Sequence, residues 1–123
     1  MENLPISTAA RRLTPSELDD FDKSGYLQGL PVFAAAAVPQ LQKRLHELEA
    51  QMPADVPISG VNMWHKANRW LYDLARTPTI LDYVEDLIGP DFFQWGGGFF
   101  VKYPGEGNFV PWHQDSQYWP LSP

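Results

Sequence analysis

The last quarter of the chain, from Phe99 to Pro123, restricts the possible folds more than any other stretch. It reads FFVKYPGEGNFVPWHQDSQYWPLSP, in which aromatic residues are interrupted by prolines and glycines at short intervals. The whole chain carries 12 prolines, nine glycines and 14% aromatic residues, among them five tryptophans. This combination is typical of a loop-rich β architecture with an aromatic-lined pocket, and it disfavours a helical bundle.

Upstream, the sequence carries a clear signal for the start of a helix. Thr14 is a good N-cap, Pro15 suits the first helical position, and Glu17 completes a Thr-x-x-Glu capping box. Gly25 then ends the stretch. We interpret this segment as a packing helix without a chemical role.

Further helices are expected between this segment and residue 91. Apolar residues at helical spacing predict a helix from about Pro39 to Gln51. The second half of residues 61–78 predicts another, with Asn68 as a possible cap. A third begins at the predicted cap Thr77, and Gly89 ends it.

Residues 92–103 are rich in strand formers and contain the triplet Gly96–Gly98. Glycines within a strand mark a bulge or the close approach of another group, whereas the same triplet also suits a plain loop. Both interpretations remain open. Residues 27–33 predict a short strand or an extended link, since Gly29 and Pro31 interrupt them.

His113 and Asp115 stand two residues apart in the segment Trp112–Asp115. In an extended strand, residues i and i+2 point to the same face, so the imidazole and the carboxylate share one side while Trp112 and Gln114 share the other. A His and a carboxylate on one face can supply two of the three ligands of a 2-His-1-carboxylate iron site. We expect Trp112 and Gln114, on the opposite face, to pack or to hydrogen-bond behind such a metal site.

The residues around this pair resemble the phytanoyl-CoA dioxygenase-like family of Fe(II)- and 2-oxoglutarate-dependent oxygenases. Two further stretches, 13–27 and 77–91, resemble that family's N-terminal helix and the helix that leads into its core. The most specific part of the resemblance lies in Lys102, Pro104 and Gly105, then Trp112, His113, Gln114 and Asp115, then Tyr118 and Trp119.

The resemblance implies an α+β fold with N-terminal helices and the first strands of a double-stranded β-helix, a jelly-roll or cupin-like core. We expect one domain, 1–123, that is incomplete. Residues 1–91 would form its mainly helical part, and residues 92–123 would form the first core strands with the metal motif.

The resemblance also implies a dioxygenase that hydroxylates a small organic substrate with Fe(II) and 2-oxoglutarate. His113 and Asp115 would bind the metal and carry the catalysis. Halogenases of this group replace the carboxylate by a small residue, so Asp115 favours hydroxylation. The remaining site residues implied are Phe100 and Lys102 at the co-substrate, and Tyr118 and Trp119 at the substrate pocket.

The family's second histidine ligand and its 2-oxoglutarate-binding arginine follow the His-x-Asp pair, and no His or Arg follows Asp115 here. We therefore expect an N-terminal portion of an oxygenase that is inactive by itself. The alternative is a non-catalytic ligand-binding protein or a degenerate family member. His46 and His65 precede the pair and are expected not to be ligands.

Charge and composition exclude several kinds of partner. The formal net charge is −6 and the pI is near 4.8, which disfavours binding to nucleic acid or to an anionic membrane. There is no cysteine, no secretory signal pattern and no apolar run of bilayer length. We expect a soluble cytoplasmic protein with a small-molecule substrate, and the sequence leaves the oligomeric state open.

Overall fold

The computed structural model describes residues 12–107 and 109–119. Within these ranges the chain forms α-helices, short 3-10 helices and extended or looped segments. The helices, in chain order, are α1 (Pro15–Ser24), η1 (Ala35–Ala37), α2 (Val38–Glu49), η2 (Ile58–Gly60), α3 (Trp64–Ala67), α4 (Arg69–Ala75), α5 (Pro78–Ile88) and η3 (Asp115–Gln117).

Helix α1 begins and ends as its sequence predicts. The Glu17 backbone N–H donates to Thr14 Oγ1 at 3.3 Å, and the Thr14 N–H donates to Glu17 Oε2 at 2.7 Å, which completes the capping box. Gly25 adopts a left-handed conformation with φ of 78°, which glycine accepts without the steric cost of a Cβ atom.

The other predicted helices are confirmed with small shifts of their ends. Asn68 Oδ1 accepts a hydrogen bond from the Leu71 N–H at 3.2 Å and caps α4. Thr77 stands at the N-cap of α5, but its hydroxyl donates to the Leu74 carbonyl at 2.8 Å instead of capping the helix. Gly89 ends α5 as expected.

The core lies where α2, η2, α3 and α4 meet. Its buried side chains are Leu48, Ile58, Trp64 and Leu71. Phe99, in the extended segment that follows α5, packs edge to face on Trp64, with ring centroids 6.2 Å apart. The Trp64 indole N–H donates to the Ile58 carbonyl at 3.4 Å, so this buried ring also has a polar partner.

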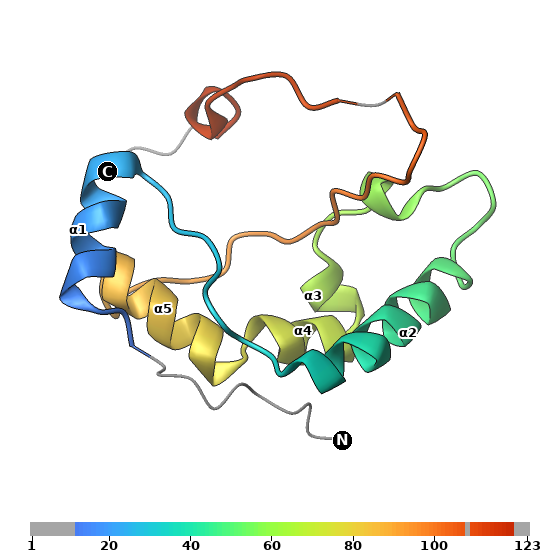
Figure 1. The fold of residues 1–123 in the computed structure, drawn as a ribbon. Coiled ribbons are helices and arrows are strands. Elements are labelled where there is room, and N and C mark those ends of the chain that lie inside the picture. Colours follow the sequence, from blue (N-terminus) through green and yellow to red (C-terminus); the bar gives the residue numbers. More distant parts are fainter. Residues whose placement is uncertain (1–11, 108, 120–123) are drawn as a thin grey trace.

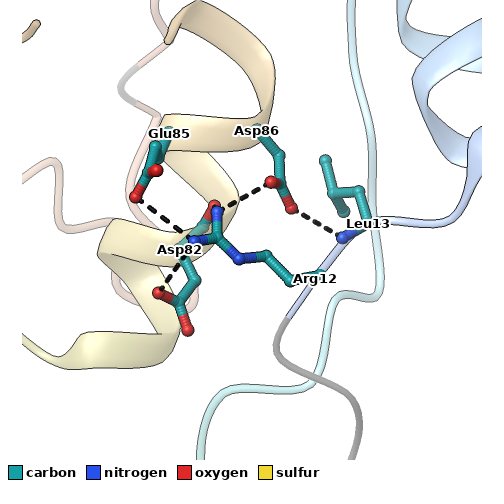
Figure 2. Close-up of polar contacts among 5 residues, drawn as sticks. All are labelled: Arg12, Leu13, Asp82, Glu85 and Asp86. Atoms are coloured by element: carbon teal, nitrogen blue, oxygen red, sulfur yellow. Dashed lines mark hydrogen bonds and ion pairs between the residues drawn. The ribbon is translucent and has the colours of Figure 1, made fainter. Parts of the chain in front are cut away.

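A cluster of charges attaches the start of α1 to α5 (Figure 2). Arg12 Nη1 lies 2.8 Å from Asp86 Oδ1, and its other terminal nitrogen lies 3.4 Å from Glu85 Oε2 and 3.9 Å from Asp82 Oδ1. The Leu13 backbone N–H donates to Asp86 Oδ2 at 2.8 Å. This hydrogen bond, followed by that from Arg12, lowers the pKa of Asp86.

After α5 the chain runs in an extended form back across the molecule (Figure 1). The Trp64 N–H donates to the Gly97 carbonyl at 3.2 Å, which holds the first part of this segment against α3. Farther along, Tyr103 donates from its hydroxyl to Glu49 at the end of α2. The segment then turns and ends at η3, on the opposite side of the molecule from α4 (Figure 1).

The predicted α+β fold is wrong for this structure. Residues 12–107 and 109–119 contain no strand or sheet, so the expected first strands of a jelly-roll are not formed there. Residues 92–103 are extended as predicted, but a strand also requires a neighbouring strand to accept and donate along its length. The backbone bonds of this segment are isolated contacts and turns, such as the one between Trp64 and Gly97, and they do not form a ladder.

Candidate functional site

Three segments that are distant in sequence enclose a cleft of about 590 Å³. The first segment is η2 with the residues that follow it, the second surrounds the glycine triplet, and the third contains the His-x-Asp pair. The lining residues are Ser59, Gly60, Val61, Asn62, Met63, Trp95, Gly96, Gly97, Gly98, Phe99, Phe100, His113, Asp115, Tyr118 and Trp119.

His113 and Asp115 lie side by side in this cleft. His113 Nε2 is 3.1 Å from Asp115 Oδ1. Gln114 between them has extended backbone angles, φ −116° and ψ 130°, which place its two neighbours on one face. The structure departs from the predicted strand at Asp115, which begins the 3-10 helix η3, but the two side chains still converge.

The backbone determines which nitrogen of His113 faces the carboxylate. His113 Nδ1 lies 2.8 Å from the Pro111 carbonyl oxygen. A carbonyl accepts only, so Nδ1 carries the proton and donates it, and Nε2 of the neutral ring is left with a lone pair. This hydrogen bond to Pro111, followed by the charge of Asp115, raises the pKa of His113.

An imidazole nitrogen and a carboxylate oxygen so close together suit a cation. When the ring is protonated, Nε2 donates to Asp115. When the ring is neutral, its lone pair and the carboxylate face one another, and a divalent metal relieves their repulsion. A hydrogen bond from Nδ1 to a backbone carbonyl is the usual way to orient a metal-binding histidine. Mixed nitrogen and oxygen ligands suit ferrous iron, so the pair fits the metal that the resemblance implies.

Within residues 12–107 and 109–119, no group of three or more His, Cys, Asp or Glu side chains is arranged to hold a metal ion. The cleft therefore offers two protein ligands. His46 is exposed on α2 and does not line the cleft. His65 does not line it either, and its buried Nδ1 has no hydrogen-bond partner among the described residues.

Most of the other predicted site residues also line the cleft. Phe100 is 90% exposed, so its ring stands free at the wall. Tyr118 packs edge to face on the His113 ring at 5.8 Å, and Trp119 packs in the same way on Trp95 at 6.0 Å. Lys102 is exposed and is not part of the lining.

Trp112 differs from its prediction. It was expected to pack or to hydrogen-bond behind the metal site, but it is fully exposed and does not line the cleft. The convergence of the His113 and Asp115 side chains thus does not depend on packing of the Trp112 side chain. It depends on the Pro111 carbonyl and on η3, where the Tyr118 and Trp119 N–H groups donate to the Asp115 carbonyl at 2.9 and 3.2 Å.

The glycine triplet is a site of close approach. A Cβ atom at Gly98 would lie 3.3 Å from Asn62 Oδ1, and one at Gly97 would lie 3.0 Å from Gln94 Nε2. Both distances are shorter than ordinary contacts, but Gln94 belongs to the same segment as the triplet, whereas Asn62 belongs to another. The triplet therefore lies in an extended loop, as one interpretation held, and at Gly98 another segment also approaches closely, as the other held.

Sequence reasoning did not find Asn62, Met63 or Trp95 as cleft residues. Met63 has φ of 60° and ψ of 33°, a left-handed conformation that is costly for a residue with a side chain and that clusters at functional sites. The Asn62 side chain accepts a hydrogen bond from the Met63 N–H at 3.2 Å, which supports that conformation. The triplet was the one sequence signal that pointed to these neighbours.

The family described as Phytanoyl-CoA dioxygenase (PhyH) matches residues 21–123, which is most of the chain and includes the whole cleft. The chain belongs to this family. The resemblance seen in the motif residues is thereby confirmed. No curated protein and no solved structure matches the chain.

Membership of the phytanoyl-CoA dioxygenase family places the chain among oxidoreductases of the dioxygenase type. Members of the family generally depend on Fe(II) and 2-oxoglutarate. Among the residues that the structure describes, no helix has the length and apolar character needed to cross a bilayer.

Proposed function

We propose that this chain carries part of an Fe(II)- and 2-oxoglutarate-dependent hydroxylation site for a small organic substrate. His113 and Asp115 are the two metal ligands that it supplies. The observation that carries the proposal is the 3.1 Å contact between His113 Nε2 and Asp115 Oδ1, with the opposite ring nitrogen held by a backbone carbonyl. The family match supports the identity of the metal and of the co-substrate.

Each residue of the pair has a distinct task. The Pro111 carbonyl holds the proton of His113 on Nδ1, so Nε2 is available to a metal. Asp115 supplies a carboxylate oxygen, and the N–H groups of Tyr118 and Trp119, just after η3, hold its backbone carbonyl. When bound, iron supplies the activation of dioxygen that oxidises a C–H bond, with 2-oxoglutarate as co-substrate.

The walls of the cleft orient and shield the substrates. We propose that Tyr118 and Trp119 contact the substrate and that Phe100 contacts the co-substrate, because their rings line the same cleft as the metal pair. These rings are partly exposed in this structure, and a bound substrate that covers them would exclude water from the reacting atoms. Lys102 lies outside the lining, so we assign it no role in this cleft.

Metal binding is the direct test, because the described residues offer two ligands and turnover requires a complete site. Calorimetry with Mn(II), a redox-stable substitute for Fe(II), should detect binding to the chain. His113→Ala and Asp115→Ala should each abolish it, whereas His46→Ala, which removes an exposed histidine of α2, should not change it. Equal affinity in wild type and His113→Ala would refute the assignment.

The pH dependence gives a second measurement on the same samples. A metal competes with the proton for His113 Nε2, and the Pro111 and Asp115 contacts raise the pKa of this ring. Mn(II) binding should therefore tighten as the pH rises through that raised pKa.

Turnover is measured as succinate released with Fe(II) and 2-oxoglutarate. Binding of an organic ligand that survives both a chelator and His113→Ala would favour the non-catalytic alternative.

A further inference from the structure

The walls of the cleft combine aromatic rings with a single formal negative charge. The rings come from two segments, with Trp95 and Phe100 on either side of the glycine triplet and Tyr118 and Trp119 directly after η3. The Met63 side chain lies nearby, with its Sδ 3.9 Å from the position of a Cβ at Gly96. These are surfaces that hold flat or bulky apolar groups.

The ring faces are accessible to a ligand. Trp95 and Trp119 meet edge to face at 6.0 Å, and they are 49% and 40% exposed. Tyr118 touches the His113 ring with its edge and is 67% exposed. An edge-to-face pair covers one face of one ring only, and these partly exposed rings therefore keep surface on which a ring of the substrate can stack within reach of His113 and Asp115.

Among the described residues that line the cleft, none is a lysine or an arginine. Asp115 is the one carboxylate of the lining, and its side chain is 78% exposed. The formal charges of a ferrous ion and of a 2-oxoglutarate dianion cancel, so when both are bound the side chains of the described lining still contribute the single negative charge of Asp115. The whole chain, with a formal charge of −6, adds to the repulsion of anions.

We infer that the substrate group held in this cleft is a ring-bearing molecule that is neutral or cationic and not anionic. The inference names the substrate class of the site proposed above and rests on that proposal. A cation is attracted both by the charge of Asp115 and by the electron-rich faces of Trp95 and Trp119. An anion is repelled by the charge of Asp115 and is not attracted by the ring faces.

This class differs from the compound in the family's name. A coenzyme A thioester carries phosphate groups, which proteins bind with Arg, Lys or helix N-termini. The described lining supplies no such side chain. The cleft is therefore unsuited to the phosphate-bearing part of such a substrate.

The test uses three probes that share one ring system and differ in charge: 2-naphthylmethylammonium, 2-naphthylmethanol and 2-naphthoate. Their affinities for the chain are measured by calorimetry, without metal and then with Mn(II) and 2-oxoglutarate. We expect the cation to bind about tenfold more tightly than the anion, with the alcohol between them. Equal or tighter binding of 2-naphthoate would overturn the inference.

Three variants locate the binding. Asp115→Asn should reduce the preference for the cation in the metal-free chain. Trp119→Ala should weaken the binding of all three probes and leave the order of their affinities unchanged. The matched control is Trp112→Ala, which removes a fully exposed indole outside the lining and should change nothing. Unchanged binding in Trp119→Ala would place the probes elsewhere and would also overturn the inference.

The two proposals can fail separately. If Mn(II) does not bind through His113 but the charge order holds, the proposed oxygenase site is wrong and the cleft remains a site for cationic ring compounds. If Mn(II) binds as expected but the anion is preferred, the metal site stands and the inferred substrate class is wrong.

Discussion

The two parts of the molecule differ in how deeply their side chains are buried. The helical part comprises residues 12–88, and the extended part comprises residues 91–119. In the first, Leu48, Trp64 and their neighbours are buried in a common core. In the second, every described residue from 109 onward is exposed, although many are large and aromatic. The buried part supplies the stability of the chain, and the exposed part holds the side chains that can do chemistry.

The magnitudes explain this division. Burying a leucine or isoleucine side chain contributes about 1.5–3 kcal/mol, so a core of four large residues outweighs any exposed contact. The contact between His113 and Asp115 is screened by solvent and adds little to stability. A substitution in one region should therefore have little effect on the property that the other provides.

The largest effect should come from Trp64→Ala. It removes a buried indole, its contact with Phe99 and its hydrogen bond to Ile58. We expect a loss of about 3–5 kcal/mol in the free energy of unfolding, measured by urea denaturation with far-UV circular dichroism. Trp112→Ala is the matched control in the exposed region and should leave the unfolding midpoint unchanged. A similar loss in both variants would remove the distinction between the regions.

Asp86→Asn should have the next largest effect. Its carboxylate accepts from the Leu13 N–H and from Arg12, and these bonds lower its pKa in the folded state. The stabilisation is thus present above the unfolded pKa and is lost as the pH falls through the lowered folded pKa. The variant should be less stable at neutral pH and should show a weaker loss of stability in acid.

Denaturation over a series of pH values measures this difference. The control is Asp22→Asn on α1, which removes an exposed aspartate and should keep the wild-type pH profile. If Asp86→Asn kept that profile as well, the charge cluster of Figure 2 would not link α1 to α5 in solution.

Thr14→Ala tests the start of α1 on a smaller scale. It removes the hydroxyl that accepts from the Glu17 N–H, and loss of such a cap costs about 1 kcal/mol. The hydrogen bonds with Thr14 also lower the pKa of Glu17, so the effect should diminish in acid. Ser16→Ala, two residues further along in the first turn of α1, should leave the free energy of unfolding unchanged. An equal loss of stability in Ser16→Ala would exclude the capping role of Thr14.

The smallest effect on stability should be that of His113→Ala. The residue lies in the exposed region, so the free energy of unfolding should not change measurably above the pKa of the ring. The raised pKa means that any stabilisation is present at low pH and is lost as the pH rises through the folded value. The same variant should abolish Mn(II) binding. A large loss of stability would show that the cleft supports the fold.

Much of the local structure could be predicted because its causes are local. Thr14, Glu17 and Gly25 act within one helix, where each backbone bond joins residues three or four apart. The proximity of His113 and Asp115 also needs only one extended residue between them. The family could be named from the motif around this pair, and its match to residues 21–123 confirmed it.

What the sequence could not decide depends on distant partners. Residues 92–103 have the composition of strands, yet a strand forms only when another strand lies alongside, and local preference cannot supply one. Likewise, no local sequence pattern places Met63 and Trp95 in one cleft, because Trp64 and Gly97 must first meet through a backbone hydrogen bond. By itself, the sequence determined the helices α1, α2, α4 and α5, the family and the His-x-Asp pair, but not the short helix α3. The tertiary structure alone decided the absence of a sheet in residues 12–107 and 109–119 and the walls of the site, because these depend on contacts between residues far apart in the chain.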